Sequence, residues 1–223
     1  MRATRALRAS LERRFRVVET AIKIGGRTLS IRHPASAEDL ITEEDFVRDE
    51  RLPYWAELWP SSRILAEKVI ALKGSGRTAL ELGCGAGLVA TCAGLAGFSV
   101  CATDYYEDAL RFARVNAWEN GAGEMATRLV DWRRLPRDLG HYDVVIGSDV
   151  LYEMSYGAVI AGALAATLKA DGEALIADPG RVARDSFIAE TARCGLKIVG
   201  TEPVAFREGL VRQTITVFRV RRR

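Results

Sequence analysis

Residues 79–87 read Ala79-Leu80-Glu81-Leu82-Gly83-Cys84-Gly85-Ala86-Gly87. An apolar run enters a turn with glycine at every second position, and a helical segment, residues 87–96, follows it. Glycine lets a chain turn sharply and lets a ligand approach the backbone closely. A strand that leads through such a turn into a helix is typical of nucleotide-binding α/β folds. The dinucleotide fingerprint G-x-G-x-x-G needs a third glycine where this chain has Leu88, so the pattern differs from that fingerprint.

Strands and helices alternate around this motif. We expect strands at Thr78–Leu82, Ser99–Asp104, Thr127–Val130, Tyr142–Ser148 and Glu173–Ala177, and helices at Pro60–Leu72, Gly87–Ala96, Tyr106–Asn120, Tyr156–Leu168 and Val182–Arg193. Two strand-like runs, Leu196–Val204 and Leu210–Val220, close the chain with no helix between them. The alternation predicts a parallel sheet, and the final pair predicts one antiparallel strand added at its edge. The fold class is therefore α/β, a doubly wound, Rossmann-like sheet of about seven strands.

The N-terminal residues precede this alternation. Leu7, Leu11 and Phe15 stand at four-residue spacing, which suits a short amphipathic helix that packs on the domain. The same Arg-rich, acid-poor stretch also resembles a transit peptide. A β-hairpin is expected around Gly25-Gly26, and a polar, acidic connector follows over residues 33–52.

We place a domain boundary after the connector. The chain has 223 residues, which fits one domain with an extension. We therefore divide it into an N-terminal helix, hairpin and connector (1–52) and a main domain (53–223).

Composition excludes several classes of protein. With 48% hydrophobic and 27% charged residues, the chain is too apolar to be disordered and is not fibrous. The net charge is +3, and no aromatic residues interleave the arginines at the chain ends, so a nucleic-acid partner is not expected. We also expect no metal, because the cysteines and histidines lack the spacing of a metal site: Cys84, Cys92, Cys101, Cys194, His33 and His141.

The compartment is inferred from the same features. Residues 82–103 carry no charge and could span a bilayer by length, but their glycines favour a strand, a turn, a helix and a second strand, so no membrane contact is expected. Nothing requires an oxidising environment, so we expect a cytoplasmic protein. In a eukaryote with residues 1–15 as a transit peptide, it would be mitochondrial. The excess of arginine over lysine favours a bacterial, GC-rich source.

Two further strand ends carry polar residues. Asp104 ends the second strand about 20 residues after the first glycines, where an acid can accept both hydroxyls of a ribose. Its alternative role is to cap the following helix. Asp131-Trp132 follows the third strand, and Trp132 offers a flat aromatic face. Its alternative role is that of a half-buried core residue.

The motifs together resemble a known enzyme family. The sequence E-x-G-x-G-x-G from Glu81 to Gly87 resembles the first motif of seven-strand methyltransferases that use S-adenosylmethionine (SAM). The segments 53–61, 147–153 and 177–181 narrow the resemblance to the family-16 methyltransferases, which are mainly protein lysine methyltransferases. The chain looks most like the electron-transfer-flavoprotein β-subunit lysine methyltransferases and their bacterial relatives, over roughly residues 50–220.

This resemblance implies a cofactor site for SAM, with S-adenosylhomocysteine (SAH) as the product. It assigns an adenine contact to the carboxylate of Asp131, a covering face to Trp132 and a wall of the pocket to Trp59. The complete set of implied cofactor-binding residues is Trp59, Glu81, Gly83, Gly85, Gly87, Asp104, Tyr105, Asp131, Trp132 and Ser148.

The resemblance also implies a catalytic pair. The family motif D-x-x-Y corresponds to Asp149 and Tyr152 and would lie beside the transferred methyl group. Both residues, with Trp55 and Arg181, would contact the substrate. Asp149 has an alternative role as a helix cap, and Arg181 an alternative role in the turn that begins at Asp178.

The predicted function is N-methylation of lysine side chains in a protein substrate. The nucleic-acid amino-methyltransferases carry N/D-P-P-Y after the fourth strand, whereas this chain has Ser148-Asp149-Val150-Leu151. Two alternatives stay open: a small-molecule N-methyltransferase of the nicotinamide type, which shares the fold and an aromatic pocket, and a non-catalytic module that binds SAM.

Overall fold

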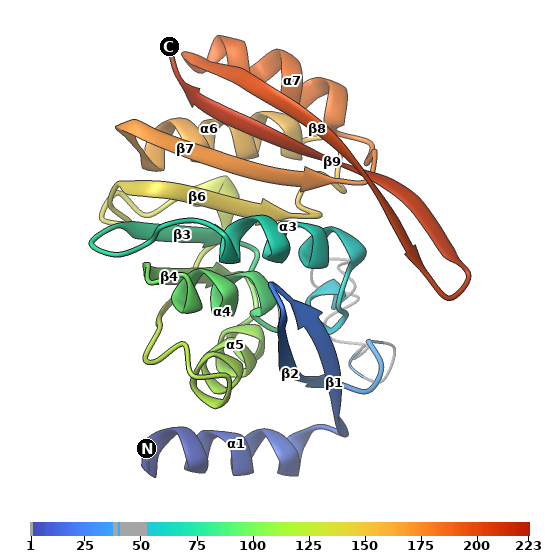
Figure 1. The fold of residues 1–223 in the computed structure, drawn as a ribbon. Coiled ribbons are helices and arrows are strands. Elements are labelled where there is room, and N and C mark those ends of the chain that lie inside the picture. The colour runs from blue at the N-terminus through green and yellow to red at the C-terminus, as the bar shows by residue number, and fades with distance from the viewer. Residues whose placement is uncertain (1, 38–39, 41–52) are drawn as a thin grey trace.

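A seven-stranded sheet with helices on both faces forms the body of the protein in the computed structural model, which describes residues 2–37, 40 and 53–223 (Figure 1). The strands are β3 (Thr78–Leu82), β4 (Ser99–Asp104), β5 (Ala126–Leu129), β6 (Tyr142–Ser148), β7 (Leu168–Asp178), β8 (Leu196–Glu208) and β9 (Val211–Arg222). The helices that cover them are α3 (Pro60–Ile70), α4 (Leu88–Leu95), α5 (Glu107–Glu119), α6 (Tyr156–Thr167) and α7 (Arg184–Arg193). The predicted fold class, with a mostly parallel sheet and an antiparallel last strand, is confirmed.

The strand order is β5-β4-β3-β6-β7-β9-β8. Strands β3 to β7 pair in parallel, and β9 is antiparallel to both β7 and β8. The order reverses between β3 and β6, and ligands of open α/β sheets bind in the crevice at the carboxyl ends of such strands. This topology brings the turn after β3 and the loop after β6 to one edge of the sheet.

The antiparallel strand was expected at the edge, and this expectation was wrong. Strand β9 lies between β7 and β8, so β8 forms the edge. Burial gives the reason, because β9 buries Ile215 and Val217 on one face and Phe218 and Val220 on the other, whereas β8 is mostly exposed. A strand that is apolar on both faces must be covered on both faces, and the inner position places β9 between the two apolar layers.

The start of β7 also differs from the prediction. We expected a helix through Leu168 and a strand from Glu173, but the strand begins directly at Leu168, where α6 ends. Leu168 is buried and pairs with Tyr142, and the register shifts before the pairing continues at Glu173. The remaining strand and helix boundaries before β8 agree with the predicted ones to within two residues.

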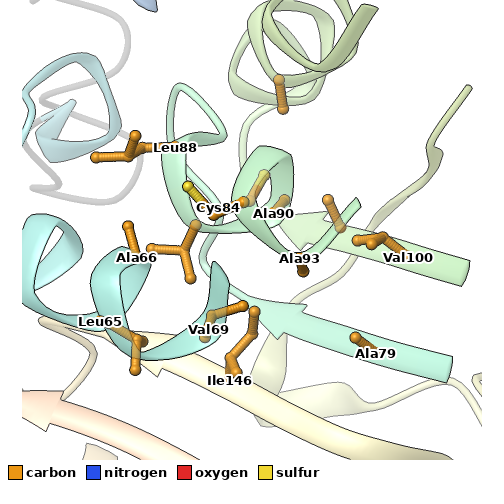
Figure 2. Packing of buried hydrophobic residues seen from close by; sticks show 14 of the residues in the cluster. Leu65, Ala66, Val69, Ala79, Cys84, Leu88, Ala90, Ala93, Val100 and Ile146 are labelled. Atoms are coloured by element: carbon orange, nitrogen blue, oxygen red, sulfur yellow. The ribbon is translucent and has the colours of Figure 1, made fainter. Parts of the chain in front are cut away.

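Two apolar layers enclose the sheet. Successive side chains of a strand point to opposite faces. Accordingly Ala79 of β3 joins the layer under α3 and α4, whereas Leu80 and Leu82 join the layer under α6 and α7. Figure 2 shows the first layer, in which Leu65 and Val69 of α3 lie close to Ile146 of β6.

The predicted N-terminal helix and hairpin are confirmed as α1 (Arg2–Arg14), β1 (Val17–Ile24) and β2 (Arg27–Pro34). The apolar face of α1 packs on α5, where Leu11 and Phe15 meet Phe112. The hairpin extends two residues into the predicted connector, and most of that connector, residues 38–39 and 41–52, lies outside the described residues. Within the described part of the chain, every helix is too short or too polar to cross a bilayer.

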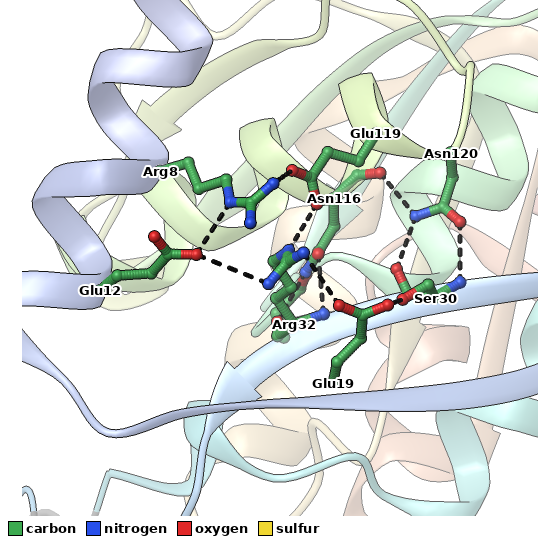
Figure 3. Close-up of polar contacts among 9 residues, drawn as sticks. Arg8, Glu12, Glu19, Ser30, Arg32, Asn116, Glu119 and Asn120 are labelled. Carbon is green, nitrogen blue, oxygen red and sulfur yellow. Dashed lines mark hydrogen bonds and ion pairs between the residues drawn. The ribbon is translucent and has the colours of Figure 1, made fainter.

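Two asparagines, Asn116 of α5 and Asn120 directly after it, fasten the hairpin to the main domain (Figure 3). The Asn116 Oδ1 accepts the N–H of Arg32, and its Nδ2 donates to the carbonyls of Arg32 and Ala86. Asn120 makes the same pair of bonds with Ser30, at 2.8–2.9 Å. The two amides thus form the hydrogen bonds with the β2 backbone that a neighbouring strand would form. Asn116 also joins the hairpin to the glycine turn after β3.

Charged pairs reinforce this junction. Glu119 accepts from Arg8 of α1 at 2.9 Å and from Arg32 of β2 at 2.5 Å, as Figure 3 shows. Arg14 forms a two-pronged pair with Asp108 of α5 at 2.6 and 2.8 Å. These side chains are partly exposed, so each pair adds at most about 1 kcal/mol.

We expect Asn116→Ala to lower the free energy of unfolding by about 3 kcal/mol, because it removes three hydrogen bonds at a site closed to water. Asn120→Ala is the matched control at a half-buried position, where water can replace the amide, and should cost about 1 kcal/mol. Urea unfolding followed by circular dichroism measures both values. Equal losses in the two variants would contradict this role of Asn116.

Candidate functional site

A cavity of about 790 Å³ opens at the carboxyl ends of β3, β4 and β6. Its volume lies within the usual range for small-molecule sites, about 300–1,000 Å³. Its walls contain all but one of the residues that the sequence predicts for the site: Trp55, Trp59, Gly83, Gly85, Gly87, Asp104, Tyr105, Asp131, Trp132, Ser148, Asp149, Tyr152 and Arg181. Residues that are far apart in the sequence are therefore brought together as expected.

The three glycines of the turn have no space for a side chain. Gly83, Gly85 and Gly87 have φ angles of 69°, 50° and 84°, a region that other residues rarely adopt. A Cβ atom at these positions would lie 2.8 Å from the Trp132 ring, 3.0 Å from the carbonyl oxygen of Trp55 and 2.6 Å from Ala113. The turn therefore combines a left-handed backbone with close contacts to three other segments.

Asp104 lies behind this turn at the end of β4. Its Oδ2 accepts the N–H of Gly85 at 2.9 Å, and its Oδ1 accepts the N–H of Tyr106 at 3.0 Å. Burial raises the pKa of Asp104 to about 6 despite these bonds. The residue fixes the turn to the start of α5 and also lines the cavity, so its two candidate roles are compatible.

Glu81 is the predicted site residue that does not line the cavity. Its neighbours Leu80 and Leu82 point toward α6 and α7, so Glu81 points to the opposite face of the sheet. Burial there raises its pKa well above the ordinary value. Its Oε2 has no hydrogen-bond partner among the described residues. Glu81 is therefore a buried acidic residue of β3 that lies outside the cavity.

Asp131 and Trp132 follow β5 as predicted. The Asp131 carboxylate accepts from the backbone N–H of Arg133 and from its guanidinium, at 2.9–3.2 Å. The Trp132 ring lies against Gly83 and makes an edge contact with Tyr156, at 5.5 Å between centroids. Its indole N–H is buried and has no hydrogen-bond partner in the described part of the chain. Trp132 therefore closes one side of the cavity.

An unusual carboxylate follows β6. Asp149 has a φ of 58°. Among the residues that the structure describes, it is the one non-glycine residue with a positive φ. Its Oδ1 accepts from Arg181 Nε at 2.5 Å, whereas its Oδ2 is buried and has no hydrogen-bond partner among the described residues. The Arg181 guanidinium lies 5.1 Å from the ring centroid of Trp59. A strained backbone and an unsatisfied buried oxygen are features that cluster at functional sites.

The turn after β7 brings Arg181 to this position. The buried carboxylate of Asp178 accepts the N–H of Gly180 at 2.8 Å and that of Arg181 at 3.2 Å. Burial raises the pKa of Asp178, and the neighbouring Asp149 contributes to the same shift. Arg181 thus belongs both to the turn and to the cavity wall, which joins the two roles that the sequence left open.

Sequence reasoning missed part of the aromatic wall. Edge contacts connect Trp59 to Tyr54, Tyr54 to Tyr152 and Tyr152 to Tyr156, at centroid distances of 5.9, 5.6 and 5.1 Å. Tyr54 and Tyr156 line the cavity and were not predicted for it. The usable signal for Tyr156 was its position, since it begins the helix expected directly after the loop that carries Asp149 and Tyr152.

Trp55 lines the cavity, and its substrate contact stays a prediction. Its ring is buried among Phe15, Tyr106 and Phe112, at centroid distances of 5.8–6.3 Å. Its backbone, not its ring, lies over Gly85. Trp55 therefore anchors the segment that carries Tyr54 and Trp59 across the mouth of the glycine turn.

Comparison with known families identifies this arrangement. The sequence profile of the lysine methyltransferase family matches residues 44–192. The chain belongs to the lysine methyltransferase family. The matched segment contains all the predicted cavity residues.

Curated relatives match parts of the chain. The chain is 30% identical over 135 residues to the electron transfer flavoprotein beta subunit lysine methyltransferase of Xenopus laevis, covering 58% of this chain and 53% of the relative. It is 32% identical over 104 residues to the ubiquinone biosynthesis O-methyltransferase of Bordetella pertussis, covering 44% and 41%. The chain thus spans about half the length of these relatives or less.

Solved structures share the fold. A SAM-dependent methyltransferase from Streptococcus mutans superposes with a TM-score of 0.64 at 10% identity, covering 91% of this chain and 55% of that one. The magnesium protoporphyrin IX methyltransferase of Synechocystis PCC 6803, solved with bound SAM, gives a TM-score of 0.58 at 20% identity and covers 81% and 91%. These similarities support the fold alone.

The cavity fits SAM in size and chemistry. It offers a buried carboxylate, Asp104, for a ribose diol, a turn without side chains for close backbone contact, and the flat ring of Trp132. Across the described ranges, no group of three or more histidine, cysteine or acidic side chains has the arrangement of a metal site.

We expect Gly83→Ala to weaken the binding of SAH by about tenfold or more, because its Cβ would displace the Trp132 ring from the cavity wall. Gly76→Ala is the matched control, since Gly76 has a similar φ of 73° but open space around it. Isothermal titration calorimetry with SAH measures both. Indistinguishable affinities would show that the close contact with Trp132 does not shape the site.

Proposed function

We propose that this protein transfers the methyl group of SAM to the side-chain nitrogen of lysine in a protein substrate. The observation that carries the proposal is the Asp149 carboxylate in the wall of an aromatic-lined cavity: one oxygen pairs with Arg181, and the other is buried without a hydrogen-bond partner among the described residues. An ammonium or amine N–H is a matching donor for that oxygen. Membership of the lysine methyltransferase family supports the same acceptor.

Within this proposal the cofactor residues divide the ligand among them. The backbone of Gly83 and Gly85 faces the amino-acid portion, Asp104 accepts from the ribose hydroxyls, and Trp132 covers the adenine. Asp131 lines the cavity and is the proposed acceptor for the adenine amino group, which would share its carboxylate with Arg133. SAM, when bound, supplies an electrophilic methyl group on sulfur.

The acceptor nitrogen must lose a proton before transfer. With an ordinary lysine pKa of 10.4, this costs about 4.6 kcal/mol at pH 7. A lone carboxylate beside the nitrogen would stabilise the ammonium and increase that cost. Here Arg181 already pairs with Asp149, so the lysine meets a nearly neutral pair, which weakens this effect.

The remaining work is orientation and exclusion of water. Asp149 accepts a hydrogen bond from an N–H of the incoming nitrogen and so directs the nitrogen's lone pair toward the methyl group. The proton that the nitrogen loses leaves through Asp149 or water. Tyr152, Tyr54 and Trp59 line the approach and keep water from the nitrogen, which favours the uncharged amine. Holding the reacting atoms in line removes several kcal/mol from the barrier.

The cysteines support a reducing compartment for this activity. All four are unpaired, and burial raises the pKa of Cys92 to about 12. A buried thiol with a raised pKa is inert as a nucleophile. We therefore propose that the protein acts in the cytoplasm. The division of the chain into residues 1–52 and 53–223 stays a separate prediction.

We expect Asp149→Asn to reduce kcat/KM for methyl transfer by about tenfold or more, a loss of about 1.4 kcal/mol, while the affinity for SAH changes little. Asparagine tolerates a positive φ, so the variant keeps the backbone of Asp149. Tritiated SAM and a size-fractionated lysate of the source organism provide the assay. Asp171→Asn, at an exposed position outside the cavity, is the control and should be unchanged.

The distribution of the label decides between the candidate functions. A discrete protein band that disappears with Asp149→Asn supports the proposal and reveals the substrate. Label confined to small molecules would indicate the nicotinamide-type alternative. No label anywhere, together with measurable SAH binding, would favour a non-catalytic module.

The raised pKa of Asp104 makes cofactor binding depend on pH. Its carboxyl group takes up a proton as the pH falls through about 6, and the ribose hydroxyls then lose an acceptor. We expect the affinity for SAH to be constant above pH 7 and to fall about tenfold between pH 7 and pH 5. Calorimetry across this range tests the expectation. Asp104→Asn should bind weakly with a flat pH profile, and a persistent slope in that variant would point to another group.

A further inference from the structure

The β8–β9 hairpin continues beyond the end of β7 (Figure 1). Strand β7 ends at Asp178, which pairs with Thr216 of β9. Residues Val211–Ile215 of β9 pair with β8 on one side and have no partner strand on the other among the described residues. A strand with one unpaired edge is a template for an additional strand.

A second cavity, of about 410 Å³, lies along this unpaired edge. Its walls include Val211 and Gln213 of β9 together with Gly180, Arg181 and Trp59. The last three residues also line the candidate active site. The unpaired edge of β9 is therefore one wall of a groove that adjoins the candidate active site, with Arg181 in the wall of both.

The hairpin tip carries exposed charge without internal compensation. Arg207 and Arg212 face each other across the two strands, and both are exposed. Neither forms an ion pair within the described part of the chain, whereas Glu208 beside them pairs with Arg63 of α3. Like charges directly opposite each other destabilise a hairpin. An acidic partner would relieve this repulsion.

The same tip exposes apolar side chains. Leu210 is fully exposed, and Val211 is 49% exposed at the groove. Two arginines beside an apolar spot fit an extended peptide that carries acidic and apolar side chains. They do not fit a nucleic-acid strand, because the tip offers no aromatic ring for base stacking: Phe206 packs on the core.

We propose that an extended, acidic segment of the protein substrate docks along the Val211–Ile215 edge of β9, in the row that β7 leaves at Asp178. Its lysine then passes the stacked side chains of Trp59 and Arg181, which line both cavities, and reaches Asp149. Its acidic side chains lie beside Arg207 and Arg212. This inference rests on the proposed function and adds to it the charge and the conformation of the substrate.

Two pairs of variants on the one hairpin test the groove. Val211→Asp changes a residue of the groove wall, and Arg212→Glu reverses a charge beside the groove. Val199→Asp and Lys197→Glu are matched controls at exposed positions of β8 that do not line the cavity. Arg212→Glu removes the repulsion with Arg207, so it cannot lose activity by weakening the hairpin. The readouts are the initial rate of labelling of the protein band that the wild type methylates in the lysate, and the affinity for SAH.

We expect Val211→Asp and Arg212→Glu to lower the labelling rate by about tenfold, a size usual for residues central to an interface. The two controls and all SAH affinities should stay near the wild-type values. Unchanged labelling by Val211→Asp and Arg212→Glu would overturn the groove while leaving the proposed function intact. Absence of any labelled protein with the wild type would contradict the proposed function and this inference with it.

Synthetic peptides test the chemistry of the partner. Three peptides place one lysine among glutamate, glutamine or arginine residues, and transfer RNA is added as a competitor. We expect the highest kcat/KM with glutamate flanks, a preference that Arg212→Glu removes, and slower hydrogen exchange of the 211–215 amides when that peptide binds. Equal rates with all three peptides would overturn the inference. Inhibition by transfer RNA that disappears with Arg212→Glu would indicate a nucleic-acid surface and would overturn it as well.

Discussion

Close packing against the backbone of the glycine turn is the constraint on which the rest of this structure depends. Trp55, Ala113 and Trp132 approach Gly85, Gly87 and Gly83 so closely that no side chain could stand there. Each neighbour belongs to a different segment, and each segment forms part of the site. Trp55 anchors the aromatic strip over the cavity, Ala113 belongs to the helix that holds the hairpin, and Trp132 closes the opposite wall. The turn thus sets the shape of the pocket and also positions its walls.

Charge around the acceptor position is arranged by a second chain of contacts. Asp178 is buried and fixes the turn that presents Arg181, and Arg181 pairs with Asp149 while it lies over Trp59. A buried carboxylate without a counter-charge is costly, so the pairing with Arg181 offsets part of the cost of burying Asp149. The positive φ of Asp149 is strain that the surrounding contacts must offset. In the proposed function, this pairing lets Asp149 orient the amine without strongly favouring its protonated form.

The limits of sequence reasoning follow from particular residues. Strands β3, β4 and β6 were predicted with their observed bounds because apolar runs end there at glycine, aspartate or serine. The position of β9 was not predicted, since a hairpin pattern does not say which strand takes the inner place. Glu81 was assigned to the cofactor site by motif similarity, although alternation along β3 places it on the other face. The contact between Arg181 and Asp149 joins residues 32 positions apart, and no local pattern encodes it.

The hydrogen bonds of the Asn116 side chain connect the two parts of the chain on either side of the predicted boundary between residues 52 and 53. It bonds at once to β2 of the N-terminal extension and to Ala86 inside the glycine turn. Local openings of a protein occur in contiguous units, and a ligand that binds only the closed form suppresses every opening that disrupts its site. An opening that detaches the hairpin from α5 also loosens the turn. Cofactor binding at the turn would therefore also stabilise the attachment of the hairpin, although no residue of β1 or β2 lines the cavity.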